Sequence, residues 1–231
     1  MKRTILYVED DQTLAFLTKD NLEQMGFKVV HFENGQLALQ QFTFYKFDIC
    51  LIDVMLPKLD GFELVKRIRD INKEIPILFL SAKSGIDDRI MGLSIGGDDY
   101  LTKPYSMEEL RLKIEVFLKR NKFEIADNHS TDIIVVGTTT LDVKNHKLLT
   151  ISSEIKLTLR ETNLIELLFR NTNQILKREE ILLKIWGNDS YFNGRSLDVF
   201  ISRIRKYLIN DYQIEIESIR SVGFRLNVNN E

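Results

Sequence analysis

The first half of the chain predicts an α/β fold: a doubly wound, five-stranded parallel sheet with helices on both faces. Apolar runs of strand length alternate five times with segments of helical period between residues 5 and 119, which is typical of such sheets. The runs Ile49–Ile52 and Pro76–Leu80 are apolar at successive positions, as in strands that are buried on both faces. With 231 residues, the chain is long enough for a second domain.

Each element of this half has a local cause. Strands are expected at residues 5–8, 27–32, 49–52, 76–80 and 100–101, where apolar residues cluster. Helices are expected between them because apolar residues recur at helical spacing, and Gly26 and Gly96-Gly97 follow two of these helices as stop signals. The last helix, at residues 107–119, begins with a capping box in which Glu109 follows the N-cap Ser106 by three positions.

Composition narrows the class of protein. With 44% hydrophobic and 29% charged residues, the chain is typical of soluble globular proteins. No apolar stretch reaches the length of a signal peptide core or a membrane span, so we expect a cytoplasmic protein with no membrane partner. The single cysteine, Cys50, cannot form an intrachain disulfide. The net charge of −2 gives no general attraction to nucleic acid, so DNA binding must rest on local charge.

Polar residues stand at the ends of four of the expected strands. Taken in strand order, the set is Glu9 and Asp10, then Asp53, Ser81 and Lys103. Because all strands of a parallel sheet point the same way, these groups should meet at one edge. Three carboxylates placed together favour a bound cation, and ligands that are all oxygen favour Mg²⁺. A hydroxyl and an ammonium group beside that ion would hold a phosphoryl group on Asp53, the expected nucleophile.

Five motifs within residues 1–121 carry a resemblance to a known family. They are Val8-Glu9-Asp10, Asp53-Val54-Met55-Leu56-Pro57, Asp60-Gly61, Ser81-Ala82 and Lys103-Pro104. Together they resemble the receiver domain of bacterial two-component response regulators. The resemblance implies a flavodoxin-like fold in which Asp53 accepts the phosphoryl group. It also implies a Mg²⁺ site made by Glu9, Asp10, Asp53 and the backbone carbonyl of Met55.

The same resemblance assigns the groups around Asp53. Ser81 and Lys103 would contact the phosphoryl group. Ser81 and Tyr100 would form a switch pair, in which the hydroxyl moves towards the phosphate and the aromatic ring turns inward. The Lys103-Pro104 peptide bond is expected to be cis, as at a fixed tight turn.

A second group of motifs resembles the OmpR/PhoB subfamily of these regulators. They are Asp88-Arg89, Gly92-Leu93 and Gly96-Gly97-Asp98-Asp99-Tyr100. Gly97 stands where the family usually has Ala, a small-for-small change that we expect to be tolerated. The subfamily dimerises through charge pairs on this face, which implies three pairs of opposite sign across a two-fold interface: Arg89 with Glu109, Asp98 with Arg120, and Asp99 with Lys113.

The second half has a different pattern. Residues 122–131 are polar and lose the helical period, so we expect a flexible linker there. Residues 132–231 show short β segments, three amphipathic helices and a terminal hairpin, which predicts an α+β winged helix-turn-helix domain. Its motifs resemble the OmpR/PhoB effector domain, which binds double-stranded DNA: Leu157-Thr158, Glu161, Arg178-Glu179, Trp186-Gly187, Arg195-Ser196-Leu197-Asp198-Val199, Ile201-Ser202-Arg203-Ile204-Arg205 and Gly223-Phe224-Arg225.

The third helix of this domain, expected at residues 195–208, is the predicted reader of the major groove. One apolar stripe runs along it, and the opposite face carries basic residues. Arg203 is the expected base contact, because Arg can bind guanine through two hydrogen bonds. The other expected contacts, mainly to phosphates, are Trp186, Arg195, Ser196, Ser202, Arg205 and Lys206, with Arg220 in the hairpin that would reach the minor groove.

These patterns predict a DNA-binding response regulator that is not an enzyme. A sensor histidine kinase would supply the phosphoryl group, a homodimer would form, and RNA polymerase is a further candidate partner. The alternative is a regulator of the same fold that binds DNA without phosphorylation. A phosphatase is disfavoured by Met55, which stands where such hydrolases carry a general acid. A nucleotide- or flavin-binding module is disfavoured because Glu9-Asp10-Asp11, not a glycine-rich loop, follows the first strand.

Overall fold

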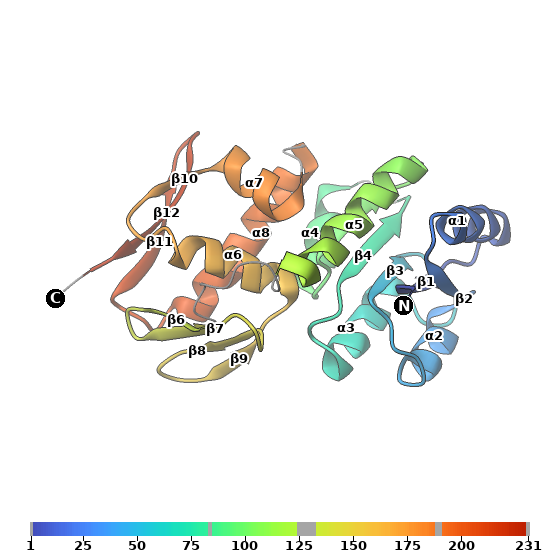
Figure 1. Cartoon of the computed structure of the whole chain (residues 1–231), viewed down its shortest axis with the longest axis horizontal. Coiled ribbons are helices and arrows are strands. Elements are labelled where there is room, and N and C mark those ends of the chain that lie inside the picture. The colour runs from blue at the N-terminus through green and yellow to red at the C-terminus, as the bar shows by residue number, and fades with distance from the viewer. Residues whose placement is uncertain (1, 83–84, 124–132, 188–190, 230–231) are drawn as a thin grey trace. The chain divides into compact units, whose positions relative to one another are not determined.

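The chain folds into two compact units, Met1–Glu124 and Ile125–Glu231. The computed structural model describes residues 2–82, 85–123, 133–187 and 191–229, and Figure 1 shows its helices and strands. Almost all of the expected linker at residues 122–131 lies outside the described residues, so the domain limits stay a prediction. None of the helices in the described ranges has both the length and the apolar character that crossing a membrane requires.

The first unit is built on a five-stranded sheet with the order β2-β1-β3-β4-β5. All neighbouring strands are parallel, which confirms the doubly wound sheet. The strands are β1 (Thr4–Val8), β2 (Lys28–Phe32), β3 (Ile49–Asp53), β4 (Ile77–Ser81) and β5 (Asp99–Thr102). Every residue of β3 and β4 is buried, as their unbroken apolar runs predicted.

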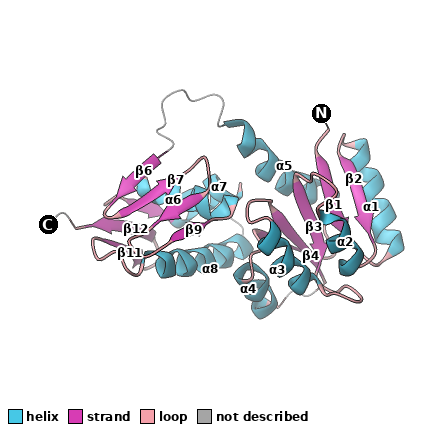
Figure 2. Cartoon of the chain, turned by 90° about the horizontal axis from the view of Figure 1, so that it is seen from below, coloured by secondary structure: helices cyan, strands magenta, loops and turns pink. Residues whose placement is uncertain are grey.

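Helices cover both faces of this sheet (Figure 2). They are α1 (Gln12–Gln24), α2 (Gly35–Phe42), α3 (Gly61–Ile71), α4 (Ile86–Ser94) and α5 (Met107–Phe123). One core lies under α2 and α3 and includes Ala38, Phe62 and Tyr100. The other lies under α1 and α5 and includes Leu22 and Ile114. Since both faces are covered, the polar groups of this fold collect at the strand ends, where the loops leave room for a site.

The second unit has antiparallel sheets and three helices within the described residues, which confirms the winged-helix expectation. A four-stranded sheet has the order β6-β7-β8-β9, with β6 (Ile133–Val136), β7 (Thr139–Asp142), β8 (Lys147–Leu149) and β9 (Glu154–Lys156). The helices are α6 (Leu159–Phe169), α7 (Arg178–Trp186) and α8 (Tyr191–Leu208). The last sheet has the order β10-β12-β11, with β10 (Ile175–Lys177), β11 (Ile214–Ile219) and β12 (Gly223–Val228).

Three details of these elements differ from the sequence prediction. The terminal sheet has a third strand, β10, which was not predicted because a strand of three residues has no periodic signal of its own. The helix α5 continues to Phe123, past the predicted end at Lys119. The helix α8 begins at Tyr191, four residues before the predicted start at Arg195. The turn between β11 and β12 has a feature of its own. Ser221 in this turn adopts a left-handed conformation with φ 60°, so the turn forms without the glycine that such a conformation favours.

Gly97 is required by its neighbour Phe79. A Cβ atom at position 97 would lie 2.5 Å from Cε2 of Phe79 and 2.9 Å from the backbone oxygen of Gly92. The Phe79 ring fills this space and packs edge-on against Phe62, with centroids 5.4 Å apart. An alanine at position 97, as is usual in the family, would therefore overpack the core of this chain. The large side chain of Phe79 on β4 explains why glycine stands here instead.

We expect Gly97→Ala to lower the free energy of unfolding of the first unit by about 1–3 kcal/mol, the usual cost of overpacking. Urea unfolding followed by circular dichroism measures this, and the fluorescence of Trp186, the one tryptophan, marks the second unit separately. In a background that carries Phe79→Leu, the added cost of Gly97→Ala should be smaller than in the parent, because the ring atoms nearest to the new methyl group are gone. A Gly97→Ala variant as stable as the parent would show that the ring moves aside at no cost.

Candidate functional site

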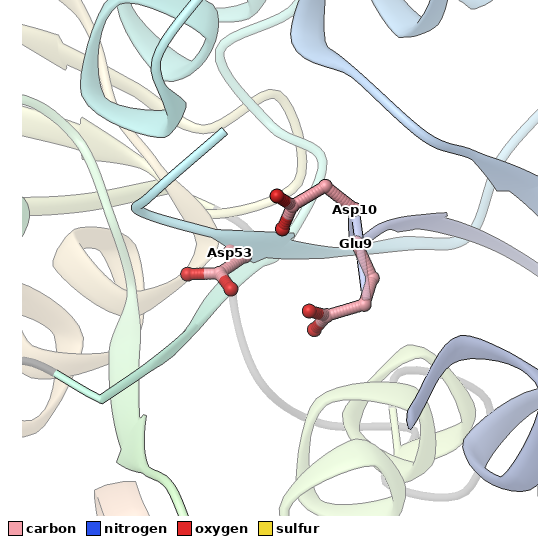
Figure 3. A group of neighbouring side chains, drawn as sticks. All are labelled: Glu9, Asp10 and Asp53. Carbon is pink, nitrogen blue, oxygen red and sulfur yellow. The ribbon is translucent and has the colours of Figure 1, made fainter. Parts of the chain in front are cut away.

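Three carboxylates meet at the carboxyl ends of β1 and β3. Figure 3 shows the side chains of Glu9, Asp10 and Asp53 beside one another, and one oxygen of each lies within 4.8 Å of the others. The strands β1 and β3 are neighbours although β2 lies between them in sequence, which makes this edge the point where open α/β sheets bind ligands. The next acid, Asp11, accepts hydrogen bonds from the Thr13 and Leu14 N–H groups and caps α1 instead.

The cluster fits a hard divalent cation. Its donors are all carboxylate oxygens, and Mg²⁺ prefers oxygen ligands at about 2.1 Å, so that opposite ligands stand about 4 Å apart. The observed limit of 4.8 Å is close to that span. The Met55 N–H donates a hydrogen bond of 2.9 Å to Oδ1 of Asp53, which fixes one oxygen of that carboxylate. Ligation by the Met55 carbonyl stays a prediction.

Lys103 joins the cluster from the end of β5. Its Nζ donates to Oε2 of Glu9 at 2.6 Å and to Oδ2 of Asp53 at 2.5 Å. Burial would lower the pKa of Lys103, but the hydrogen bonds to Asp53 and Glu9 outweigh burial and raise it. Burial raises the pKa of Glu9, and the contact with Lys103 opposes that rise only in part. The Lys103-Pro104 bond is cis, as expected.

Ser81 and Tyr100 lie behind this cluster on β4 and β5. Both are buried, at 0% and 1% exposure, so the tyrosine ring is already turned inward. Burial raises the pKa of Tyr100, and a hydrogen bond with Ser81 opposes this rise. The Arg89 guanidinium lies 5.6 Å from the centroid of the Tyr100 ring and donates to the Tyr100 carbonyl at 3.2 Å. The expected switch pair is therefore in contact.

The structure corrects the expected charge pairs of the dimer face. Asp98 is fully buried and pairs with Arg69 of the same chain at 2.7 Å, so it cannot pair with Arg120 of a second copy in this conformation. Asp99 does pair with Lys113, but within the chain, at 2.8 Å. Sequence spacing could not show this, because pairs within and between chains use the same opposite charges.

The other members of the expected dimer face differ in exposure. Arg89 is 7% exposed and lies 3.9 Å from Asp99, so it too is engaged within the chain. Glu109 is exposed on α5. The side chain of Arg120 lies outside the described residues. Apolar side chains are exposed on the same two helices, with Ile90 on α4 at 38% and Leu112 on α5 at 50%.

The expected base contact, Arg203, is held inside the second unit. Its Nη1 lies 2.6 Å from Oε1 of Glu161, and the two side chains are only 15% and 3% exposed. The guanidinium also lies 5.1 Å from the centroid of the Phe200 ring. This corrects the placement of Arg203 on the open face of α8: the residue is at the edge of that face, and its charge is balanced by a buried carboxylate on α6.

Two of the expected phosphate contacts are buried as well. Trp186 is 1% exposed and Ser196 is 0% exposed. The Arg160 guanidinium lies 4.8 Å from the centroid of the Trp186 ring, and the Phe200 ring packs edge-on at 5.7 Å. In this conformation neither side chain can contact a phosphate. The sequence did not indicate that Trp186 is buried, because a tryptophan near a helix end can either pack in the core or bind a ligand.

The remaining predicted DNA contacts are exposed. Arg195, Ser202, Arg205 and Lys206 lie on α8 and Arg220 lies in the turn after β11, and all five are exposed to solvent. Arg205 has a further role, because its Nη2 donates to the carbonyl oxygen of Ile216 at 2.7 Å and to Oγ of Ser218 at 2.8 Å. It therefore ties α8 to the strand β11.

One residue that shapes this face was not predicted. Arg178, at the start of α7, forms two hydrogen bonds to the carboxylate of Asp198 on α8, at 2.8 and 2.7 Å. Its guanidinium lies 5.9 Å from the centroid of the Phe224 ring on β12. It thus connects α7, α8 and the terminal sheet. The two residues are 20 positions apart, so no local pattern in the sequence indicates the pair.

Both parts of the chain match known protein families. Residues 5–115 match the family model of the response regulator receiver domain, and residues 152–226 match that of the transcriptional regulatory protein, C terminal. These are a regulatory and a transcriptional family and not enzyme families. Receiver domains bind Mg²⁺ at an acidic pocket, and Glu9, Asp10 and Asp53 form such a group here.

Relatives of known name cover nearly the whole chain. The transcriptional regulatory protein RprY of Bacteroides fragilis is 40% identical over 225 residues, which are 97% of this chain and 94% of that protein. The alkaline phosphatase synthesis transcriptional regulatory protein PhoP of Bacillus subtilis is 33% identical over 98% of this chain and 97% of its own.

A solved structure of a related protein also covers nearly the whole chain. The response regulator DrrB of Thermotoga maritima, described as an OmpR/PhoB homologue, superposes with a TM-score of 0.53 at 26% identity and covers 98% of this chain and 100% of its own. The chain therefore belongs to the OmpR/PhoB family of two-component response regulators, in which a receiver domain is joined to a DNA-binding transcriptional regulatory domain.

Proposed function

We propose that this regulator accepts a phosphoryl group on Asp53 from the histidine of a sensor kinase, in the cytoplasm. The proposal depends on the convergence of Glu9, Asp10, Asp53 and Lys103 from three strand ends: the three acids lie together, and Lys103 bonds to two of them, Glu9 and Asp53. A nucleophilic carboxylate needs a counter-charge for the incoming phosphate and positive charge that balances the neighbouring acids. Lys103 beside Asp53 supplies positive charge, and a cation held by the three acids would supply more.

Each residue has a distinct task in the proposed transfer. Glu9, Asp10 and Asp53, with the Met55 carbonyl, would hold Mg²⁺, which balances the charge of the phosphate oxygens. An Asp53 oxygen attacks phosphorus, and the bond from phosphorus to the donor nitrogen breaks as the new one forms. Lys103 already contacts Asp53 and would then pair with a phosphate oxygen. The Ser81 hydroxyl would donate a hydrogen bond to another phosphate oxygen in place of its present hydrogen bond with Tyr100.

We further propose that phosphorylation favours a homodimer through α4, β5 and α5. Charge pairs across the interface have weaker support than expected, because Asp98 and Asp99 are engaged within the chain. The support comes instead from the apolar side chains of Ile90 and Leu112, which are exposed on this face. The dimer places two effector domains on adjacent half-sites, and the linkers raise their effective concentration at DNA. Contact with RNA polymerase would follow at the promoter.

Light scattering with and without a small phosphodonor and Mg²⁺ tests the dimer. We expect the molar mass to double with the phosphodonor, and the variant Leu112→Glu to stay monomeric because a buried unpaired charge opposes the contact. The matched control is Leu17→Glu on α1, a residue with 53% exposure away from this face, and it should dimerise. If Leu112→Glu dimerised like the parent, the interface would lie elsewhere.

The raised pKa of Glu9 predicts how Mg²⁺ affinity depends on pH. Burial disfavours the charged form of this carboxyl, so protons compete with the cation for Glu9 above the ordinary glutamate value of about 4.3. The affinity should therefore already fall on acidification from about pH 7.5 to about pH 5.5, an interval in which an ordinary glutamate would remain more than about nine-tenths charged. Isothermal titration calorimetry measures this. An affinity that is constant over that interval would show that Glu9 does not bind the ion.

A further inference from the structure

The solvent-exposed face of α8 contains fewer residues than the sequence pattern predicted, because Arg203 is not fully exposed on it. Its exposed residues, among those whose side chains the structure describes, are Arg195, Asp198, Ser202, Arg205 and Lys206. At about 100° per residue, these positions span roughly a third of the helix circumference, and Ser202 lies at the centre of that arc. Arg203 and Arg205 lie near its two edges. A helix in the major groove contacts base edges with the centre of its exposed face, and the flanks approach the phosphates.

The arginine at one edge, Arg203, is committed to a buried carboxylate. Glu161 is 3% exposed, and it also accepts a hydrogen bond of 2.9 Å from the Tyr207 hydroxyl and one of 2.8 Å from the Thr158 N–H. Turning Arg203 out to a base would leave Glu161 buried with no cation beside it, which is strongly unfavourable. To bind guanine through two hydrogen bonds, the guanidinium needs two of its N–H donors free. Here the Nη1 group of Arg203 already donates to Glu161.

The arginine at the other edge, Arg205, is committed to the backbone of β11. Its Nε and Nη2 both donate to the carbonyl oxygen of Ile216, at 3.0 and 2.7 Å. On the same flank the carboxylate of Asp198 is occupied by Arg178. These contacts fix the rotation of α8 about its own axis, with α6 on one side and the terminal sheet on the other.

We infer that Ser202 is the residue of α8 that selects a base, and that Arg203 and Arg205 are positioning residues. The inference rests on the proposed binding of double-stranded DNA through α8. Arg195, Val199, Ser202 and Lys206 follow one another at spacings of four, three and four, which makes one stripe along the helix. Ser202 lies in the middle of this stripe, with a cation towards each end. Its hydroxyl can donate to or accept from a base edge, and its short side chain lets the helix lie deep in the groove.

The test is selection of bound duplexes from a random pool by the full-length chain, treated with a phosphodonor, followed by affinities for all single-base changes of the selected site. The parent should select one sequence. Ser202→Ala should reduce the discrimination at one base pair of each half-site by about 5-fold or more, the lower range for a direct base contact, and leave the other positions unchanged. Arg203→Lys keeps a cation beside Glu161 but lacks the planar fork, so it should select the parent sequence.

A double variant keeps the test decisive if a single change unfolds the domain. Glu161→Gln with Arg203→Met removes both charges of the pair together, which leaves no uncompensated charge in the interior, and it should also select the parent sequence. The inference is overturned if either Arg203 variant loses preference at one base pair while Ser202→Ala keeps the full parent preference. If the parent itself selects no sequence, the proposed DNA binding through α8 fails, and this inference fails with it.

Discussion

The variant Asp53→Asn should take up no phosphoryl group. The parent, incubated with Mg²⁺ and a small phosphodonor such as acetyl phosphate, should gain the mass of one phosphoryl group, and the asparagine variant should keep its original mass. The amide of asparagine is not a nucleophile under these conditions, and the remaining acids of the cluster, Glu9 and Asp10, are proposed ligands of Mg²⁺ and not acceptors. Intact-mass spectrometry measures the difference directly.

The fold should survive this change. A neutral amide in place of the Asp53 carboxylate would leave Glu9 and Asp10 with less repulsion between like charges, and Lys103 would keep its contact with Glu9 at 2.6 Å. The matched control is Asp60→Asn. Asp60 caps α3 by accepting from the Phe62 and Glu63 N–H groups, and Asn is an equally good N-cap, so this variant should be phosphorylated like the parent. An adduct of parental yield on Asp53→Asn would place the acceptor elsewhere.

The variant Glu161→Gln should destabilise the second unit by roughly 3–5 kcal/mol, the usual cost of leaving one partner of a buried ion pair without the other. Glu161 receives hydrogen bonds from Arg203, Tyr207 and the Thr158 N–H. Its loss therefore affects the start of α6 and the attachment of α8 together. Urea unfolding followed by the fluorescence of Trp186 reports on this unit, because the chain has one tryptophan and it lies in α7.

A control on the same helix separates this effect from the general cost of the substitution. Glu166 pairs with Arg170 at 2.8 Å, but the two side chains are 26% and 36% exposed. Exposed pairs contribute about 0–1 kcal/mol, so Glu166→Gln should change stability by no more than that. Equal losses for the two variants would mean that the Glu161–Arg203 pair has no special part in holding α8.

The sequence was sufficient for the receiver half because its signals are local and agree with one another. Unbroken apolar runs marked β3 and β4, and glycines marked the ends of two helices. The order of acids, hydroxyl and ammonium along the chain then placed the site, since parallel strands all end at one edge. The structure brings Glu9, Asp10, Asp53 and Lys103 together as predicted, and the order of the strands explains why.

The sequence was less informative about the ion-pair partner of each charged side chain. Asp98 and Asp99 were expected to pair with a second copy, and the structure engages both within the chain. Arg203 was expected on an open face, and its partner Glu161 lies 42 positions earlier in another helix. Opposite charges at a distance in sequence can pair in many ways, and only the packing of the helices decides among them. Trp186 was misplaced for a similar reason, since its burial depends on Arg160 and Phe200.

Phosphorylation of Asp53 should control binding to DNA, and fluorescence anisotropy with the duplex that the parent selects measures this control. The affinity of the parent should rise when Mg²⁺ and the phosphodonor are added together, and the affinity of Asp53→Asn should stay at the untreated level. If the phosphodonor raised both affinities equally, or if the untreated parent already bound as tightly as the treated one, the protein would be a regulator that binds DNA without phosphorylation.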